Sequence, residues 1–304
     1  MLKLTSLLAL TGVMGVAQAQ FLYQAQRDIA DQGIKLVGWG GGLVAQSDDV
    51  AWEGSRSIRI SSQSFFQGGI LNFGSAQNLS SPFADKNNLL MVRLNIPVIT
   101  GGGGGGGRQG GGGLSGTGEG SGGDGGRQNN TVQVEVKPLK TVRMVFTTSD
   151  GKKSECYLDI SNITKDERGW ISAGIPLQAI NGFGVTNKMI TSIAIGGDTR
   201  STFYVGGMNI ENDRTPVYAE PNVRDLNLAY GDEVTFSATG YAGATPVKFM
   251  WDFDSRDGIT EDATGQVVKR RFRTPGTFTV TLTAVDIYGL KQPYSTTIKV
   301  TVNP

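Results

Sequence analysis

Hydrophobic and polar residues alternate with a period of two along most of this chain. The clearest case runs from Phe278 to Val285, where apolar residues occupy every second position and threonines fill most of the positions between. Successive side chains of a β-strand point to opposite faces of its sheet, so this pattern predicts a strand with one buried and one wet face. Turn residues flank it at Pro275-Gly276 and at Asp286 to Gly289, which is typical of strand ends.

The same alternation recurs in short segments over the rest of the chain, and no helical stripe of useful length interrupts it. Strands are predicted around residues 58–60, 90–96, 132–136, 142–146, 171–175, 193–195 and 208–210, and further along at 234–238, 249–253, 267–272, 278–285 and 296–302. Many short strands separated by Gly, Asn, Ser and Asp turns predict an all-β protein built of antiparallel sandwiches.

The first 19 residues have the pattern of an export signal. Lys3 precedes an apolar run from Leu4 to Val16, and Ala17-Gln18-Ala19 supplies the small residues of a cleavage site. The alternative is a membrane anchor, but the run is shorter than the ~20 residues that span a bilayer. We therefore expect a signal peptide at 1–19 and a secreted, extracellular or cell-surface protein without a transmembrane segment after its removal.

The remaining length suits two sandwiches. We expect one at 21–213 and one at 223–304, joined by a linker at 214–222 that holds two prolines. Of the 26 residues from Gly101 to Gly126, 18 are glycine. Such a segment has no side chains to bury and a large ordering entropy. It predicts a disordered insert at 101–130 within a loop of the first sandwich, the alternative being an inter-domain linker. No Lys-Ser or Lys-Thr follows the glycines, which excludes a phosphate-binding loop.

The C-terminal part carries a family resemblance. The stretches FMWDFDSRDG and PGTFTVTLTAVD, followed by YG, resemble those of the PKD domain, an immunoglobulin-like sandwich of extracellular proteins. The resemblance implies a module that spaces, adheres or binds and seldom catalyses. Trp251 is in step with Phe249 and Phe253, which favours a core position.

Three stretches of the N-terminal part, within 34–212, carry a second resemblance: EGSRSIRISSQSFFQGGILNFG, RGWISAGIPLQAI and ITSIAIGGDTRSTFYVGGMNI. In this order they resemble galactose-binding-like jelly rolls of carbohydrate-binding modules. The resemblance implies that Trp170 packs inside. Such jelly rolls often hold a structural calcium with acidic residues after the aromatic pair of the last strand, but Gly206-Gly207 stand there in this chain, which puts that site in doubt. Glycine at this place suggests a bulge or a close backbone approach.

Composition excludes several kinds of chemistry. The chain has no histidine, which removes His-based acid–base catalysis, Ser–His and Cys–His nucleophiles and His-ligated zinc. A net charge of +1 argues against nucleic acid as a partner, and the basic residues from Lys269 to Arg273 fit solvated charge on an edge strand. Cys156 is in step with Leu158 and Ile160, so we expect a small core residue.

Two groups of residues are candidates for binding. The carboxylates of Asp252, Asp254, Asp257 and Glu261 lie at short spacing around a turn and could converge on a structural calcium; the alternative is that these acids face solvent. We expect no other cofactor. Aromatic side chains in turn-rich settings, namely Trp39, Trp52 and Phe65, could stack against a sugar ring, the alternative being that each tryptophan caps a sandwich core.

These observations favour a secreted, non-catalytic binding protein that engages polysaccharide or a cell-surface glycan through its N-terminal sandwich. In this hypothesis the PKD-like sandwich is a spacer or an adhesion module. The alternative is a structural or adhesive surface protein without a sugar ligand, whose partners are other surface proteins. A carboxylate-dependent enzyme is the third hypothesis, but no acidic residue stands in a setting that would shift its pKa.

Overall fold

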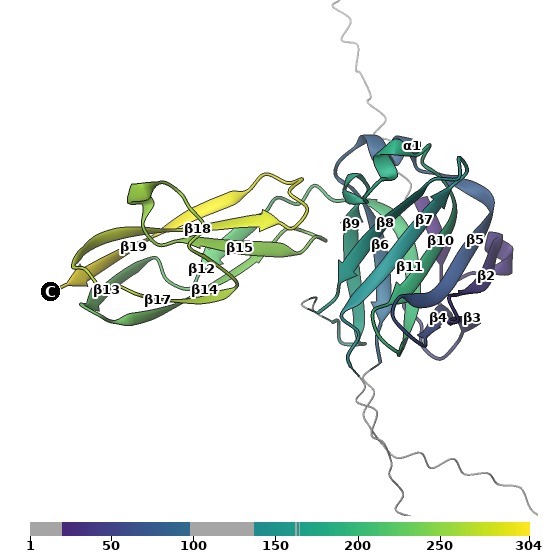
Figure 1. The fold of residues 1–304 in the computed structure, drawn as a ribbon, viewed down its shortest axis with the longest axis horizontal. Coiled ribbons are helices and arrows are strands. Elements are labelled where there is room, and N and C mark those ends of the chain that lie inside the picture. Colours follow the sequence, from purple (N-terminus) through teal and green to yellow (C-terminus); the bar gives the residue numbers. More distant parts are fainter. Residues whose placement is uncertain (1–19, 98–136, 162, 164) are drawn as a thin grey trace, which may run out of the picture.

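The computed structural model describes residues 20–97, 137–161, 163 and 165–304. The signal peptide predicted at 1–19, the glycine insert predicted at 101–130 and the strand predicted at 132–136 lie outside these residues. The described chain is all-β and forms two sandwiches, which appear in Figure 1 as separate lobes with the C terminus at the far tip of the second. The predicted fold class is confirmed.

The first sandwich consists of two antiparallel sheets between which the chain crosses repeatedly, as in a jelly roll. One sheet has the order β3-β4-β11-β6-β9, with β1 paired to β11, and the other has the order β2-β5-β10-β7-β8. The strands are β1 (Gln20–Gln24), β2 (Ile34–Trp39), β3 (Leu43–Ser47), β4 (Ser57–Ser62), β5 (Gln67–Asn78), β6 (Asn88–Asn95), β7 (Thr141–Thr148), β8 (Lys153–Asp159), β9 (Trp170–Pro176), β10 (Met189–Gly197) and β11 (Ser201–Asn212). Short helical turns lie at the ends, among them α1 (Ser80–Ala84) and η3 (Phe183–Val185).

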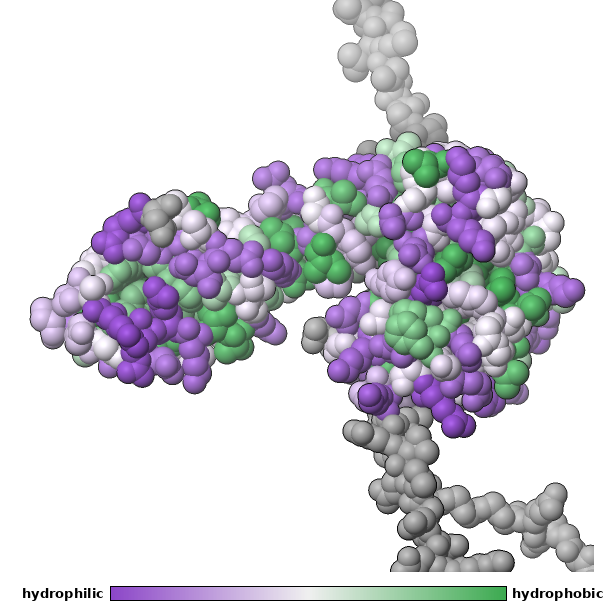
Figure 2. All heavy atoms as spheres, in the orientation of Figure 1, coloured by the Kyte–Doolittle hydropathy of each residue, from purple (hydrophilic) through white to green (hydrophobic). Residues whose placement is uncertain are grey.

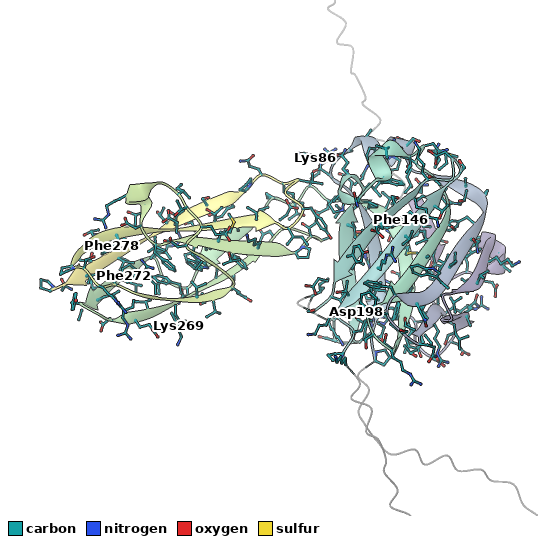
Figure 3. The ribbon with its side chains drawn as sticks, viewed as in Figure 1. Lys86, Phe146, Asp198, Lys269, Phe272 and Phe278 are labelled. Carbon is teal, nitrogen blue, oxygen red and sulfur yellow. The ribbon has the colours of Figure 1, made fainter. Side chains whose placement is uncertain are left out.

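The core of the first sandwich is made by the inward positions of the alternating strands. Phe146 lies in this sandwich (Figure 3) and is fully buried. Trp170 and Cys156 are buried as predicted. Burial, and secondarily the charge of Glu155, raises the pKa of the Cys156 thiol to about 12, so this thiol stays protonated and unreactive at neutral pH.

The second sandwich also has two sheets, a three-stranded one of order β12-β14-β17 and a five-stranded one of order β13-β19-β18-β15-β16. The strands are β12 (Tyr218–Pro221), β13 (Asp225–Ala229), β14 (Glu233–Tyr241), β15 (Val247–Asp252), β16 (Ala263–Thr264), β17 (Val267–Arg271), β18 (Gly276–Asp286) and β19 (Tyr294–Asn303). Trp251 is fully buried at the centre, as predicted, and its Nε1 donates to the carbonyl oxygen of Gly265 at 2.9 Å.

Two predictions need correction here. The linker predicted at 214–222 is wrong for Tyr218–Pro221, which forms β12 and pairs antiparallel with β14. Pro221 is the last residue of this edge strand, where a missing N–H is tolerated. Thr281 of β18, predicted on the wet face, is only 4% exposed. The turn η4 (Ser255–Asp257) packs against the same strand.

The two sandwiches meet through polar contacts at the end of β11. Lys291 Nζ donates to Asp213 Oδ2 at 2.8 Å and to the carbonyl oxygens of Thr215 and Ala242 at 3.0 and 2.6 Å. The amide of Gly174 in β9 donates to the carbonyl oxygen of Ala244 at 3.2 Å. Tyr288 packs against the core of the first sandwich. In the described part of the chain, no helix is long and apolar enough to cross a bilayer.

Candidate functional site

One row of cross-strand neighbours runs over the outer face of the sheet β2-β5-β10-β7-β8 and contains aromatic residues at both ends. The register pairs Trp39 with Gly68, Gly68 with Gly196, Gly196 with Arg143 and Arg143 with Tyr157. Directly paired residues share a sheet face. The row therefore presents two aromatic rings and a guanidinium, with two glycines between Trp39 and Arg143.

The glycines allow side chains from distant strands to meet. Three inter-strand spacings of about 4.8 Å separate the backbones of Trp39 and Arg143. The guanidinium carbon of Arg143 nevertheless lies 5.6 Å from the ring centre of Trp39. It also lies 5.7 Å from the ring of Phe66 and 5.8 Å from the ring of Tyr157, all within the range of a cation–π contact.

The segment between β4 and β5 completes the group. The rings of Phe65 and Phe66 have centroids 4.1 Å apart, and Phe66 meets Tyr157 edge to face at 5.6 Å. Phe66 adopts a φ of +50°, which is uncommon for a bulky residue and turns the two neighbouring rings toward the same side. We call Trp39, Phe65, Phe66, Arg143 and Tyr157 the aromatic cluster.

A close backbone approach holds this segment on the sheet. A Cβ atom at Gly196 would lie 2.7 Å from the carbonyl oxygen of Gln67 and 3.0 Å from the carbonyl carbon of Phe66. The Phe66 amide also donates to the carbonyl oxygen of Gly197 at 2.7 Å. The segment can lie this close only because residue 196 has no side chain.

The cluster is open to solvent and electrically balanced. Phe65 is 68% exposed and Tyr157 is 50% exposed, while Trp39 and Phe66 are half-buried. Nε and Nη2 of Arg143 both donate to Glu155 Oε2, at 3.0 and 2.6 Å. Glu155 is the outward neighbour of Tyr157 on β8. The site thus offers aromatic faces beside a paired donor and acceptor, with no net charge from this pair.

Trp52 lies apart from the aromatic cluster. Its ring lies 4.8 Å from the guanidinium carbon of Arg168 and 5.5 Å from that of Arg93, and it meets Trp170 edge to face at 5.9 Å. A Cβ atom at Gly206 would lie 2.5 Å from Cζ3 of Trp170 and from Cβ of Trp52. The close approach predicted at this glycine is confirmed, and the register of β11 also shifts there. Of the three aromatic candidates, the structure brings Trp39 and Phe65 together and leaves Trp52 elsewhere.

The calcium candidates whose side chains the structure describes, namely Asp252, Asp254 and Glu261, do not converge. Asp254 accepts hydrogen bonds from Arg256, and Glu261 accepts from Lys248 and Thr264. Asp252 Oδ1 accepts from the Asp254 amide at 2.9 Å. The side chain of Asp257 lies outside the described ones. Among the residues that the structure describes, no three carboxylate or thiol ligands gather at one point as they would around a metal ion.

Arg143 and Tyr157 escaped the sequence reasoning. Tyr157 and Arg143 stand at the outward positions of alternating strands, where polar or amphipathic residues are expected and single out no function. Sequence alternation indicates the face of each residue but not which strands are neighbours. Only the register reveals that these outward positions share a row with Trp39.

The C-terminal sandwich has a clear family match. Residues 215–302 match the family model of the PKD domain, which confirms the resemblance drawn from the sequence for this part of the chain. None of the curated proteins compared with the chain matches it.

Solved structures with some similarity include three with sugar-related descriptions. A nucleoside hydrolase-related hypothetical protein from Saccharophagus degradans, associated with carbohydrate metabolism, is 16% identical over 30% of this chain and 26% of that chain, with a TM-score of 0.26. A carbohydrate-binding module of the β-sandwich superfamily is 13% identical over 62% of this chain and 61% of that chain, with a TM-score of 0.34. The tandem CBM22-1-CBM22-2 domain of Paenibacillus barcinonensis Xyn10C is 9% identical over 93% of this chain and 84% of that chain, with a TM-score of 0.32.

The chain spans about a quarter of the first of these structures and less than two thirds of the second.

Proposed function

We propose that this chain is a secreted, non-catalytic glycan-binding protein whose first sandwich binds a neutral polysaccharide at the aromatic cluster. The observation that carries the proposal is the row of cross-strand neighbours in which two glycines let Arg143 meet Trp39, with exposed rings of Phe65 and Tyr157 beside them. Aromatic faces fit the apolar C–H face of a pyranose, and a guanidinium–carboxylate pair can donate to and accept from its hydroxyls.

The charge of the site favours a neutral ligand. Arg143 already makes a two-donor contact with Glu155, so an anionic group would compete with a carboxylate that is in place. Hydroxyl groups can bind at the edge of such a pair without displacing either partner. The PKD domain, connected through the Lys291 contacts, then acts as a spacer or adhesion module that presents the first sandwich to the polymer.

The test is affinity electrophoresis of the full chain in gels that contain neutral polysaccharides such as xylan, β-glucan and galactomannan. We expect retardation by at least one polymer. Phe65→Ala and Tyr157→Ala should each weaken binding about tenfold, on the order of 1–2 kcal/mol, because each removes one aromatic anchor. Both side chains are largely exposed, so the variants should fold normally.

Tyr230→Ala is the matched control, since Tyr230 is 59% exposed and lies on the second sandwich. It should bind as the parent chain does. Failure of all neutral polymers to retard the protein would reject the proposal and leave the structural or adhesive role. Release of soluble sugars during incubation would instead point to the enzyme hypothesis.

A further inference from the structure

A second candidate site lies beside β17, an edge strand of the second sandwich. The aromatic cluster lies on the first sandwich. A groove of about 560 Å³ is lined by Phe253, Asp254, Arg256, Lys269, Arg270, Arg271, Phe272, Arg273, Thr274 and Phe278. We call it the basic groove. Its volume is within the range of ligand-binding pockets. Figure 2 shows strongly hydrophilic side chains in this part of the second lobe, where Figure 3 labels Lys269 and Phe272.

The floor of the basic groove is apolar and rigidly packed. Phe253, Phe272 and Phe278 are each less than 10% exposed. The rings of Phe272 and Phe278 have centroids 5.2 Å apart, and Phe236 stands beneath at 5.7 Å from Phe253. Because the floor is apolar, water screens the charges at the rim less than it screens charges on a flat polar surface.

The rim has more cations than carboxylates. Its described side chains include five cations and one carboxylate, that of Asp254. Glu233 of the neighbouring strand faces Lys269 at 3.5 Å and Arg271 at 3.8 Å, and Asp254 accepts from Arg256. Glu233 and Asp254 are thus paired with Lys269, Arg271 and Arg256. Among the described residues, no carboxylate is hydrogen-bonded to Arg270 or Arg273.

Stacking holds two of the guanidiniums in place. Arg270 lies with its guanidinium carbon 5.2 Å from the ring centre of Phe253, and Arg256 lies 5.1 Å from that of Phe278. A guanidinium stacked on a ring keeps its N–H edges available for a planar oxyanion, and little side-chain entropy is then lost on binding. Charge on an edge strand also discourages edge-to-edge pairing, but that role requires neither a groove nor an aromatic floor.

We propose that the basic groove binds an anionic residue of a glycan through its sulfate or carboxylate group, with Arg270 and Arg273 as the principal contacts. The proposal does not depend on the function assigned to the aromatic cluster. Nucleic acid is disfavoured because the net charge of the whole chain is +1 and the aromatic rings of the floor are too buried to stack on bases. A short anionic segment of a sugar chain needs only local charge.

The experiment measures binding of the full chain to dextran sulfate, unsulfated dextran, polygalacturonate and duplex DNA in 50 mM and 150 mM NaCl. We expect dextran sulfate or polygalacturonate to bind, with weaker binding at the higher salt concentration, and dextran to be inert. Which of the two polymers binds distinguishes a sulfate from a carboxylate. The variant Arg270→Gln/Arg273→Gln should lose at least about tenfold in affinity.

The matched control is Arg224→Gln/Lys299→Gln, which removes the same charge from exposed positions elsewhere on the same domain; it should lose less than about twofold. Arg270→Lys/Arg273→Lys keeps the charge without the planar fork and should give intermediate affinity. The proposal would be overturned if neither polyanion binds, or if the test and control variants lose affinity equally. It would also be overturned if DNA binds more tightly than the polyanions and Arg270→Gln/Arg273→Gln weakens that binding to the same extent.

Discussion

At the scale of single residues, the absence of a side chain at Gly196 determines the shape of the aromatic cluster. A Cβ atom there meets backbone atoms of Phe66 and Gln67, which cannot rotate away as a flexible side chain would. A methyl group must therefore push the Phe66 segment off the sheet. Sequence alternation cannot reveal this, because a glycine on a strand has the same appearance whether its space is empty or occupied by a distant segment.

We expect Gly196→Ala to destabilise the folded chain by about 1–3 kcal/mol, the usual cost of overpacking, and to weaken binding at the aromatic cluster. Gly184→Ala is the control, since its Cβ atom would meet only Phe83 Cζ at an ordinary 3.6 Å. Urea denaturation of both variants measures the difference. Equal midpoints for the two variants would show that the Phe66 segment does not lie against β10.

At the scale of elements, β18 shows how far the alternation of apolar and polar residues extends. The strand spans Gly276–Asp286. It includes the predicted range 278–285, with two more residues at the N-terminal end and one more at the C-terminal end. Leu282 and Val280 are fully buried, while Thr277 and Thr279 are exposed. The exception is Thr281, which is only 4% exposed. The period of two assigns each residue to a face but does not specify which outer-face positions other segments bury.

We expect Leu282→Ala to lower the free energy of unfolding of the second sandwich by about 2–5 kcal/mol, through lost apolar contact and the cavity left behind. Thr279→Ala, on the exposed face of the same strand, should change it by no more than about 0.5 kcal/mol. Scanning calorimetry follows the transition of this sandwich. Similar shifts for both variants would contradict the assignment of faces.

At the scale of the whole molecule, a largely buried ion pair lies at the contact between the sandwiches. The side chains of Lys291 and Asp213 are 10% and 11% exposed. Burial alone would raise the pKa of Asp213, but hydrogen bonds from Lys291, Ala244 and Thr215 outweigh it and lower the pKa to about 2. This pairing explains why the segment after β11 is held against the second sandwich instead of acting as a free linker.

We expect Lys291→Met to destabilise the chain by about 3–5 kcal/mol, because it leaves a carboxylate without its cation. Lys86→Met, at an exposed position of the first sandwich (Figure 3), is the control and should have little effect. Small-angle scattering should show a wider range of inter-lobe distances in Lys291→Met alone.

The same pair predicts a pH dependence of stability. The folded pKa of Asp213 lies below its ordinary value of 3.8, so the ionised form stabilises the folded chain above about pH 4. This contribution, about 2 kcal/mol, is lost as the pH falls from about 4 to 2. In Asp213→Asn the melting temperature should therefore fall less steeply over this range. An identical slope in the variant would contradict the role of the pair.

The sequence by itself determined that the protein is all-β, that its C-terminal part resembles the PKD domain whose family model it matches, and that Trp170, Trp251 and Cys156 are core residues. These features depend on the local period of two and on short motifs, which are written along the chain. Only the tertiary structure decided that Trp39 and Phe65 share a site with Arg143 and that the expected linker contains a strand. Strand order and register arise from pairing between distant segments, and no local pattern specifies which outward side chains become neighbours.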